Sequence, residues 1–475
     1  MSLPCQNLRS LPELAGLTNF TAAAKPGLSV NEVVTRLKRF HYTYLRVWNL
    51  LLSRLTAEPA YELKMLFSYH AYLCSEQVTT HRDRVAEMRH PPLGLDKIPH
   101  PGLERLFDEI RNAPTTVELC AGLYLKALPA LRLAMERHLQ DTNPLADAPT
   151  VRVLRQAMLD VNDMIESGQR AVAALVKEAL PTGYENWLTM LDECLAAAGT
   201  LDGTHRMSDE LPATIHSATP FVYDSVPRRD GRFPDPYNMG VHAEEFLYSD
   251  EFRPIDKTVL MYYKRLREID VPEMMASILV EMGDKPWEFY RDLTRQLWDE
   301  ARHAMMGETG FVKLGIDWGK FVMVNFTWSK GLNEQLTPQE RHAVLWFIEQ
   351  GLMNKTGKRY EWEIGMESGD PLSATYQDYD WADEVLHARI GRDWYVKNFD
   401  GVDSAAAYGS ACWNKVMTDW AAWKREGKTE HRNWWPELYS EFCRLRGEAP
   451  EPNALAFSKT YAETRADLQR IAQSG

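Results

Sequence analysis

The amino-acid sequence predicts an all-α protein with two successive helical bundles and a helical C-terminal extension. In both halves of the chain, long segments carry apolar residues at spacings of three and four, as helices with one buried face do. Some of these segments also begin with helix-start signals, such as the capping box and first-turn proline of Thr337-Pro338-Gln339-Glu340. With 475 residues, the chain is long enough for two or three domains with their own cores.

The first bundle is expected over residues 1–198. Its candidate helices share the three-and-four spacing of apolar residues and cover 30–55, 61–88, 116–140 and 151–180. We interpret this bundle as metal-free and structural, forming a wall of a substrate pocket or a dimer surface.

Residues 199–260 lose the helical periodicity and are expected to form a linker or a covering segment. The segment collects five prolines, at positions 212, 220, 227, 234 and 236. Large aromatic side chains recur along the segment, at Tyr223, Phe233, Tyr237 and Phe246. We therefore expect it to pack along the bundles rather than move freely.

The second bundle, expected over residues 261–400, contains the pattern D-E-x-x-H twice, at Asp299–His303 and at Asp383–His387. On a helix, residues three apart point into the same space, so each Glu and His could bind one metal ion together. One such pair is half a site, and two facing pairs could hold two ions.

Two further glutamates lie in helical segments of this bundle. Glu273 follows Pro272 at a helix start, and the tight link at residues 283–286 would fold the next helix back and bring Glu273 level with Glu300. Glu268, one and a half turns earlier, is the alternative. Glu349 lies among apolar residues of the segment that begins at Thr337, where an unpaired buried charge would cost several kcal/mol.

Bundle sites for two iron or manganese ions use one Glu from each of two helices and a Glu-x-x-His from each of the other two. The six expected metal ligands are Glu273, Glu300, His303, Glu349, Glu384 and His387. Four ionised carboxylates this close would repel by roughly 4 kcal/mol per adjacent pair at an effective dielectric near 20, which two divalent ions would cancel. Carboxylate and imidazole donors without thiolates suit iron or manganese.

Asp299 and Asp383 are expected to orient the histidine rings, each serving the histidine of the opposite helix. In the competing interpretation, all these acids are exposed helix residues and the histidines pack in the core.

The segment 267–394 resembles the ferritin-like di-iron carboxylate proteins. Glu273-Met274-Met275-Ala276 resembles their first-helix E-x-x-A, and Asp299-Glu300-Ala301-Arg302-His303 resembles their D-E-x-x-H. Glu349-Gln350-Gly351-Leu352 and residues 364–370 are similar to a bacterial ferritin-like family of unknown function, itself akin to a tRNA-hydroxylating di-iron enzyme. This resemblance implies a metal-binding four-helix bundle without implying a substrate.

These residues lead us to expect an O2-dependent oxidase or monooxygenase that acts on a small organic substrate. Its cofactors would be two Fe ions, or Fe with Mn, with O2 as co-substrate, and Glu300 and Glu384 would be the catalytic carboxylates. An external electron donor would fit this chemistry. The alternatives are a non-catalytic ferritin-like iron- or manganese-binding or structural protein, and an RNA-modifying hydroxylase.

The composition of the chain indicates which kinds of binding partner and which cellular compartment to expect. A formal net charge of -13 argues against a general nucleic-acid binder. The chain has neither an apolar run of membrane-spanning length nor a leader-like start, and its six cysteines form no C-x-x-C pair, so we expect a cytoplasmic protein with reduced thiols. A homodimer is compatible with all of this. Residues 401–475 are expected to form an aromatic-rich helical extension.

Overall fold

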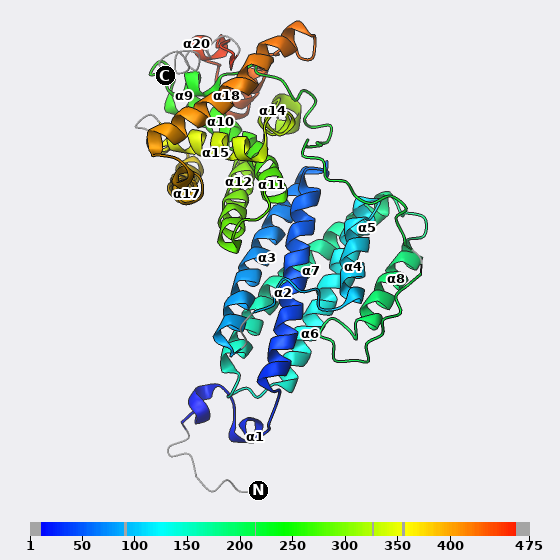
Figure 1. Ribbon diagram of the computed structural model, residues 1–475. Coiled ribbons are helices and arrows are strands. Elements are labelled where there is room, and N and C mark those ends of the chain that lie inside the picture. The colour runs from blue at the N-terminus through cyan, green and yellow to red at the C-terminus, as the bar shows by residue number, and fades with distance from the viewer. Residues whose placement is uncertain (1–10, 90–92, 214, 325–326, 354–356, 462–475) are drawn as a thin grey trace. The chain divides into compact units, whose positions relative to one another are not determined.

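The computed structural model describes residues 11–89, 93–213, 215–324, 327–353 and 357–461 (Figure 1). All regular secondary structure in these described ranges is helical, which confirms the all-α prediction. The chain divides into two compact units. The first comprises Met1–Leu50 and Leu73–Val222, and the second comprises Leu51–Tyr72 and Tyr223–Gly475.

The four long helices expected in the first half of the chain are confirmed, with ends that differ by a few residues at most. They are α2 (Val30–Leu55), α3 (Tyr61–Glu87), the continuous run of α5 (Thr116–Ala121), η3 (Gly122–Ala127) and α6 (Leu128–Asp141), and α7 (Ala148–Glu178). The sequence analysis missed two further helices, α4 (Pro101–Arg111) and α8 (Tyr184–Ala197). Two short elements precede α2, namely η2 (Glu13–Gly16) and α1 (Phe20–Ala23).

Helix α7 shows why the apolar spacing predicted these helices. Its buried face carries Leu154, Ala157, Val161 and Met164 at steps of three and four residues, and Gly168 continues the row. A Cβ atom on Gly168 would lie 2.1 Å from the ring of Tyr124, so only glycine lets α7 pack this closely against η3.

Two buried histidines in the first unit are held in their neutral form. His41 is 1% exposed, and neither of its ring nitrogens makes a hydrogen bond. Burial, together with the nearby His81, lowers the pKa of His41 to about 3. Burial also lowers the pKa of His81 to about 4, although its Nδ1 lies 2.8 Å from the Gln77 carbonyl oxygen.

These depressed pKa values predict that acid destabilises the first unit. An unfolded histidine has a pKa of about 6.5, so the unfolded chain binds more protons below that pH, and the stabilisation is lost as the pH falls toward the native pKa. Replacing His41 by Leu should reduce the stability lost between pH 7 and pH 5 by about 2 kcal/mol. Urea unfolding followed by circular dichroism at the two pH values measures this. His205→Leu, an exposed change in the same unit, is the control; equal pH dependence in both variants would contradict the prediction.

The second unit contains the remaining helices. They are α9 (Ala243–Leu247), α10 (Pro254–Arg267), α11 (Asp270–Glu281), α12 (Trp287–Leu314), α13 (Trp318–Phe321), α14 (Thr327–Gln335), α15 (Pro338–Leu352), α16 (Lys358–Glu367), α17 (Pro371–Trp394), η4 (Val396–Asn398), α18 (Val402–Arg425), α19 (Trp435–Arg446) and α20 (Pro452–Leu455). The capping box predicted before α15 is present, because Thr337 and Glu340 bond each other's backbone N–H groups.

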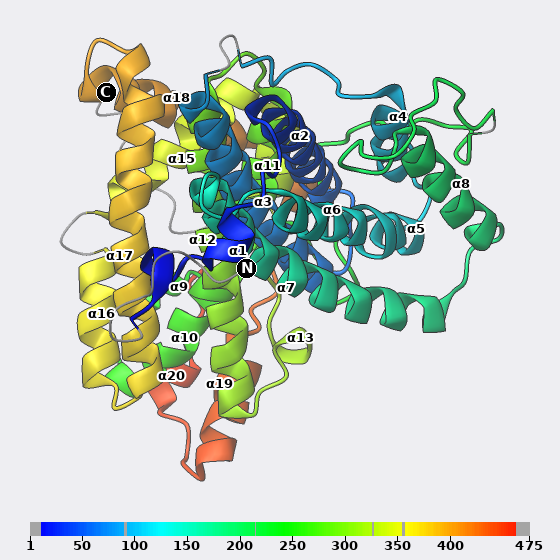
Figure 2. The same cartoon turned by 90° about the horizontal axis from the view of Figure 1, so that it is seen from below.

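Four stretches of helix surround the candidate site: α10 with α11, then α12, α15 and α17. Helix α12 packs against α10, α11 and α17, while α15 packs against α11 and α17. Helix α16 lies beside α17 (Figure 2). Gly307 allows α12 to approach the backbone of α10, since a Cβ there would lie 2.2 Å from the backbone nitrogen of Leu266.

The stretch expected as one linker, residues 199–260, is divided between the two units. Its first part packs in the first unit, where the Phe221 N–H donates to Asn112. Its later part packs in the second unit, where the Arg228 N–H donates to the Thr56 carbonyl oxygen. Helix α10 already begins at Pro254, before the boundary drawn at residue 261.

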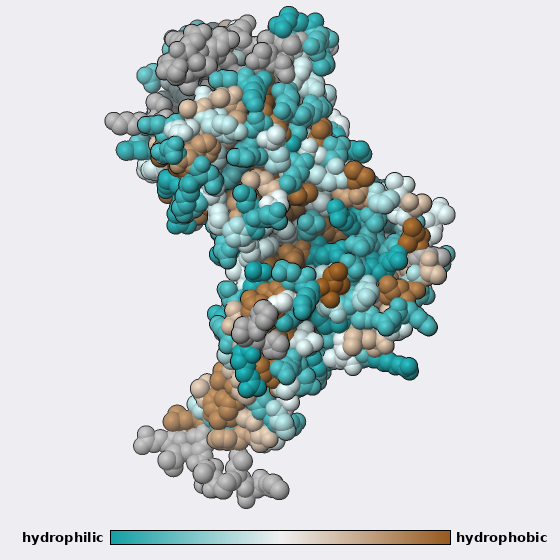
Figure 3. Space-filling model, viewed as in Figure 1, coloured by the Kyte–Doolittle hydropathy of each residue, from teal (hydrophilic) through white to brown (hydrophobic). Residues whose placement is uncertain are grey.

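The face of the molecule shown in Figure 3 is mostly hydrophilic, with apolar patches that are small and separated. Within the described ranges, no helix is both long and apolar enough to cross a membrane.

Candidate metal centre

The two D-E-x-x-H segments lie inside α12 and α17 and face each other. Glu300 and His303 on α12, and Glu384 and His387 on α17, are all buried. The centroids of the two imidazole rings are 6.0 Å apart.

Carboxylate and imidazole groups gather here in two sets, each with ligand atoms within 4.8 Å of one another. The His303 set comprises Glu268, His303, Asp380 and Glu384. The His387 set comprises Glu300, Glu349, Glu384 and His387. Glu384 belongs to both sets, so the two together form one continuous cluster.

Many of the potential ligand atoms lack a hydrogen bond. These buried atoms include Nδ1 of His303 and His387 and one oxygen each of Glu268, Glu300, Glu349, Asp380 and Glu384. The two Nδ1 atoms lie 3.1 to 3.6 Å from carboxylate oxygens without a well-aligned hydrogen bond. Because buried polar atoms are normally paired, such convergent unpaired atoms fit a bound cation.

The outer nitrogen of each histidine faces an aspartate of the opposite helix, the arrangement expected from the sequence. The Nε2 atom of His303 lies 3.2 Å from Asp383, and that of His387 lies 3.4 Å from Asp299. Arg302 donates to both aspartates and so ties the two pairs together. With Nε2 occupied in this way, Nδ1 of each ring is directed at the cluster.

These contacts also control the protonation of the rings. Burial by itself lowers the pKa of His303, but its contacts with Asp383, Glu268 and Glu300 outweigh burial and raise the pKa to about 10. The pKa of His387 is likewise raised well above its ordinary value, by Asp299 and Glu300 against the effect of burial. A metal ion would therefore replace a proton at each Nδ1.

The pKa values of Glu349 and Glu384 are shifted in opposite directions by their surroundings. Burial, and the nearby Glu384 and Glu300 carboxylates, raise the pKa of Glu349 well above its usual value. Burial would also raise the pKa of Glu384, but Lys358 and neighbouring hydrogen bonds hold it well below that value. The cluster thus contains one carboxyl group that favours its proton and one that is strongly anionic.

Two cationic side chains touch the His303 set, and the sequence analysis identified neither. Lys358 Nζ lies 2.8 Å from Glu384 and 2.9 Å from Asp380, and Arg265 lies 3.0 Å from Glu268 and also pairs with Asp380. Asp380 itself was missed as well. Its position four residues before Glu384 on the same helix was the available signal.

The choice of Glu273 as the first-helix ligand is not supported, because Glu273 lies outside both sets and Glu268 is present instead. The Glu273 carboxylate pairs with Lys64 at 2.9 Å and with Arg229 at 2.7 Å, and it accepts a hydrogen bond from Ser329. Helix α10 extends to Arg267, and its end places Glu268 opposite His303. Glu273 lies in the next helix, α11, where residues far away in the sequence neutralise its charge.

The cluster borders a cavity of about 1230 Å³ within the second unit. Glu268, Glu300, Glu349 and Glu384 contribute to its wall. The remaining wall is mixed. Its apolar part includes Val271, Met274, Leu345, Trp346, Phe347, Ile348 and Trp413, and its charged part includes Glu244, Glu245, Lys264, Arg267 and Asp270. A space of this size beside the ligands can accommodate an organic molecule.

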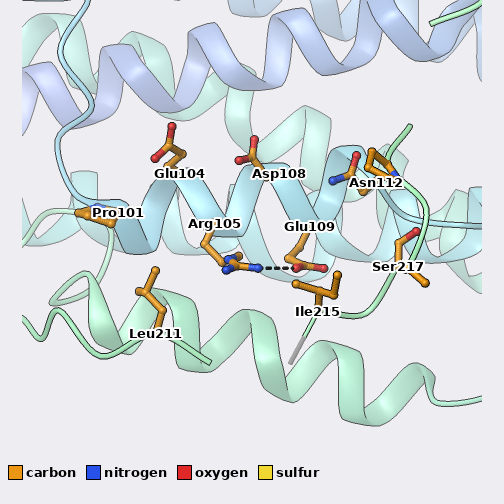
Figure 4. Close-up of a pocket in the computed structure, with 11 residues that line it drawn as sticks. Pro101, Glu104, Arg105, Asp108, Glu109, Asn112, Leu211, Ile215 and Ser217 are labelled. Atoms are coloured by element: carbon orange, nitrogen blue, oxygen red, sulfur yellow. Dashed lines mark hydrogen bonds and ion pairs between the residues drawn. The ribbon is translucent and has the colours of Figure 1, made fainter. Parts of the chain in front are cut away.

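A smaller hollow of about 340 Å³ belongs to the first unit (Figure 4). Two of its acidic groups, Asp108 and Glu109, already have partners. Arg105 pairs with Glu109, Arg46 pairs with Asp108, and the His216 N–H donates to Glu109. We assign no chemistry to this hollow.

Comparison of the chain with protein-family models, with curated proteins and with solved structures finds no match.

The contrast between Glu268 and Glu273 gives a matched test. Under saturating Mn²⁺, Glu268→Gln should bind about one ion fewer per chain than the wild type, since ligand sites need their full set of donors. Glu273→Gln should keep its metal but lose about 3–5 kcal/mol of stability, because Lys64 and Arg229 lose a buried partner. Plasma mass spectrometry after dialysis and urea unfolding give the two readouts. Loss of metal in Glu273→Gln with metal retained in Glu268→Gln would reverse the assignment.

Proposed function

We propose that the second unit is a ferritin-like bundle that binds two iron ions, or iron with manganese, and uses O2 to oxidise a small organic substrate. The observation that carries this proposal is the pair of carboxylate and imidazole sets that share Glu384 beside a cavity whose wall is part apolar and part polar. The donor types and the four contributing helices match those of bundle sites for two iron or manganese ions.

The charge of the cluster supports occupation by cations. Its five carboxylates outnumber the arginine and lysine side chains that contact them, which are Arg265 and Lys358. The raised pKa values of His303, His387 and Glu349 place protons in the cluster that balance the remaining carboxylate charge, and metal ions would replace these protons.

Each set has the residues to hold one ion. Glu268, His303 and Asp380 would hold one, Glu300, Glu349 and His387 the other, and Glu384 would contact both. Two ferrous ions held together would supply the electrons with which O2 is reduced.

The surrounding residues have their own tasks. Asp299 and Asp383, held by Arg302, keep the histidine rings oriented toward the cluster. Leu345 and Trp346 form apolar wall beside the carboxylates, which excludes water from the reacting substrate. The high pKa of Glu349 means that this residue gives up a proton when its carboxylate becomes a ligand.

The first test is metal binding with an optical readout. The protein loaded anaerobically with excess Fe(II) should retain about two irons per chain, and air should then produce a charge-transfer absorption while O2 is consumed. Glu384→Gln should bind neither ion tightly, because Glu384 belongs to both sets. Its circular dichroism spectrum should match that of the wild type, which separates loss of ligands from loss of fold. A wild-type protein that binds no iron, or a variant that binds both ions, would rule the proposal out.

A second test separates an oxidase from an iron-storage protein. When Fe(II) is added in steps under air, the iron retained should stop at about two per chain, since one closed cluster rather than an open storage surface binds it. Gel filtration followed by iron analysis measures the retained metal. Continued uptake to many irons per chain would favour storage.

A further inference from the structure

The two sets of ligands differ in the cations that already contact them. Lys358 Nζ lies 2.8 Å from Glu384, 2.9 Å from Asp380 and 3.5 Å from Glu268. It thus touches all three carboxylates of the His303 set, and its side chain is fully buried there.

Arg265 adds a second positive charge to the same set. Its guanidinium pairs with Asp380 and with Glu268, and the residue is 0% exposed. In contrast, no lysine or arginine of the described ranges forms an ion pair with Glu300 or Glu349. Contact of a lysine or arginine with the His387 set is therefore confined to Glu384, the residue that both sets share.

We propose that Lys358 serves as a built-in cation of the His303 set, so that the centre fills in a fixed order. The first metal ion binds the His387 set while the Lys358 ammonium stays among Glu268, Asp380 and Glu384. The second ion binds the His303 set only when Nζ withdraws from these oxygens. This inference rests on the proposed metal-binding function and specifies how that function is controlled.

The order follows from electrostatics and from shared lone pairs. An ammonium group within hydrogen-bond distance of carboxylate oxygens occupies the lone pairs that a metal ion needs, and it repels a divalent ion at short range in a poorly screened interior. The His387 set presents no such competitor at Glu300 or Glu349.

Lys358 is also suited to leave. It is the first residue of α16, directly after Gly357, and its charge lies at the end of a flexible four-carbon stem. Arg265, by contrast, lies within α10 and spreads its contacts over Glu268, Asp380 and Glu361.

The consequence is control over when the centre becomes complete. In the one-ion state Lys358 and Arg265 together neutralise the empty half of the cluster, so its carboxylates keep cationic partners. Reduction of O2 by two ferrous ions requires the second ion, so Lys358 sets the metal concentration at which the centre becomes competent.

The test is an anaerobic Mn²⁺ titration of the full-length protein, read by equilibrium dialysis with plasma mass spectrometry and by electron paramagnetic resonance. The wild type should bind its two ions with dissociation constants about tenfold or more apart, and the first equivalent should give the spectrum of an isolated ion. Lys358→Met should tighten binding of the second ion by about tenfold or more. Lys264→Met, which removes a buried lysine paired with Glu361 outside both sets, should leave both constants unchanged.

Single-histidine variants test the order with Lys358 intact, in case Lys358→Met does not fold. His303→Ala should still bind one Mn²⁺ as tightly as the wild type binds its first ion, whereas His387→Ala should bind none at that concentration. Two ions of equal affinity in the wild type, unchanged in Lys358→Met, would overturn the filling order and leave the proposed function intact. Absence of Mn²⁺ and Fe²⁺ binding in every protein would overturn both.

Discussion

The need to compensate buried negative charge governs the second unit. Carboxylates on α11, α12, α15 and α17 are almost completely removed from water, and each such charge costs several kcal/mol unless a partner is present. The chain uses two ways of compensating this charge. Glu273 is matched by Lys64 and Arg229, whereas no lysine or arginine of the described residues forms an ion pair with Glu300 or Glu349. That difference separates a structural ion-pair network from a candidate ligand cluster.

The ligand cluster depends on a rigid frame of paired helices. Asp299 on α12 contacts His387 on α17, and Asp383 on α17 contacts His303 on α12. These two contacts require the helices to lie side by side with the two D-E-x-x-H segments at the same height along them. The frame is close-packed where glycine permits, as at Gly307 against α10. Because the rings are oriented from outside the cluster, their inward nitrogens remain available as ligands.

The position of the cavity connects this frame to chemistry. Carboxylates of both sets contribute to the cavity wall, and apolar side chains of α11 and α15 lie in the same wall. A metal staple that only stabilised a bundle would need no such space, whereas a site that directs an oxidant toward an organic molecule requires it. Lys358 also controls metal binding in this proposal, because it competes with a metal ion for the carboxylates of the His303 set. In the described part of the chain it forms no ion pair with Glu300 or Glu349 of the His387 set.

The sequence by itself determined the helical class, the approximate bounds of four long helices in the first half, and the two Glu-x-x-His pairs with Glu349. Apolar spacing and the Glu-x-x-His step are local consequences of helix geometry, so they can be read without knowing how the helices pack. Tertiary structure decided the rest. Whether Glu268 or Glu273 joins the cluster depends on where α10 ends, and the cations that neutralise Glu273 come from remote parts of the chain. The role of Lys358 likewise appears only when α16 packs against α17, because contacts between helices follow no sequence period.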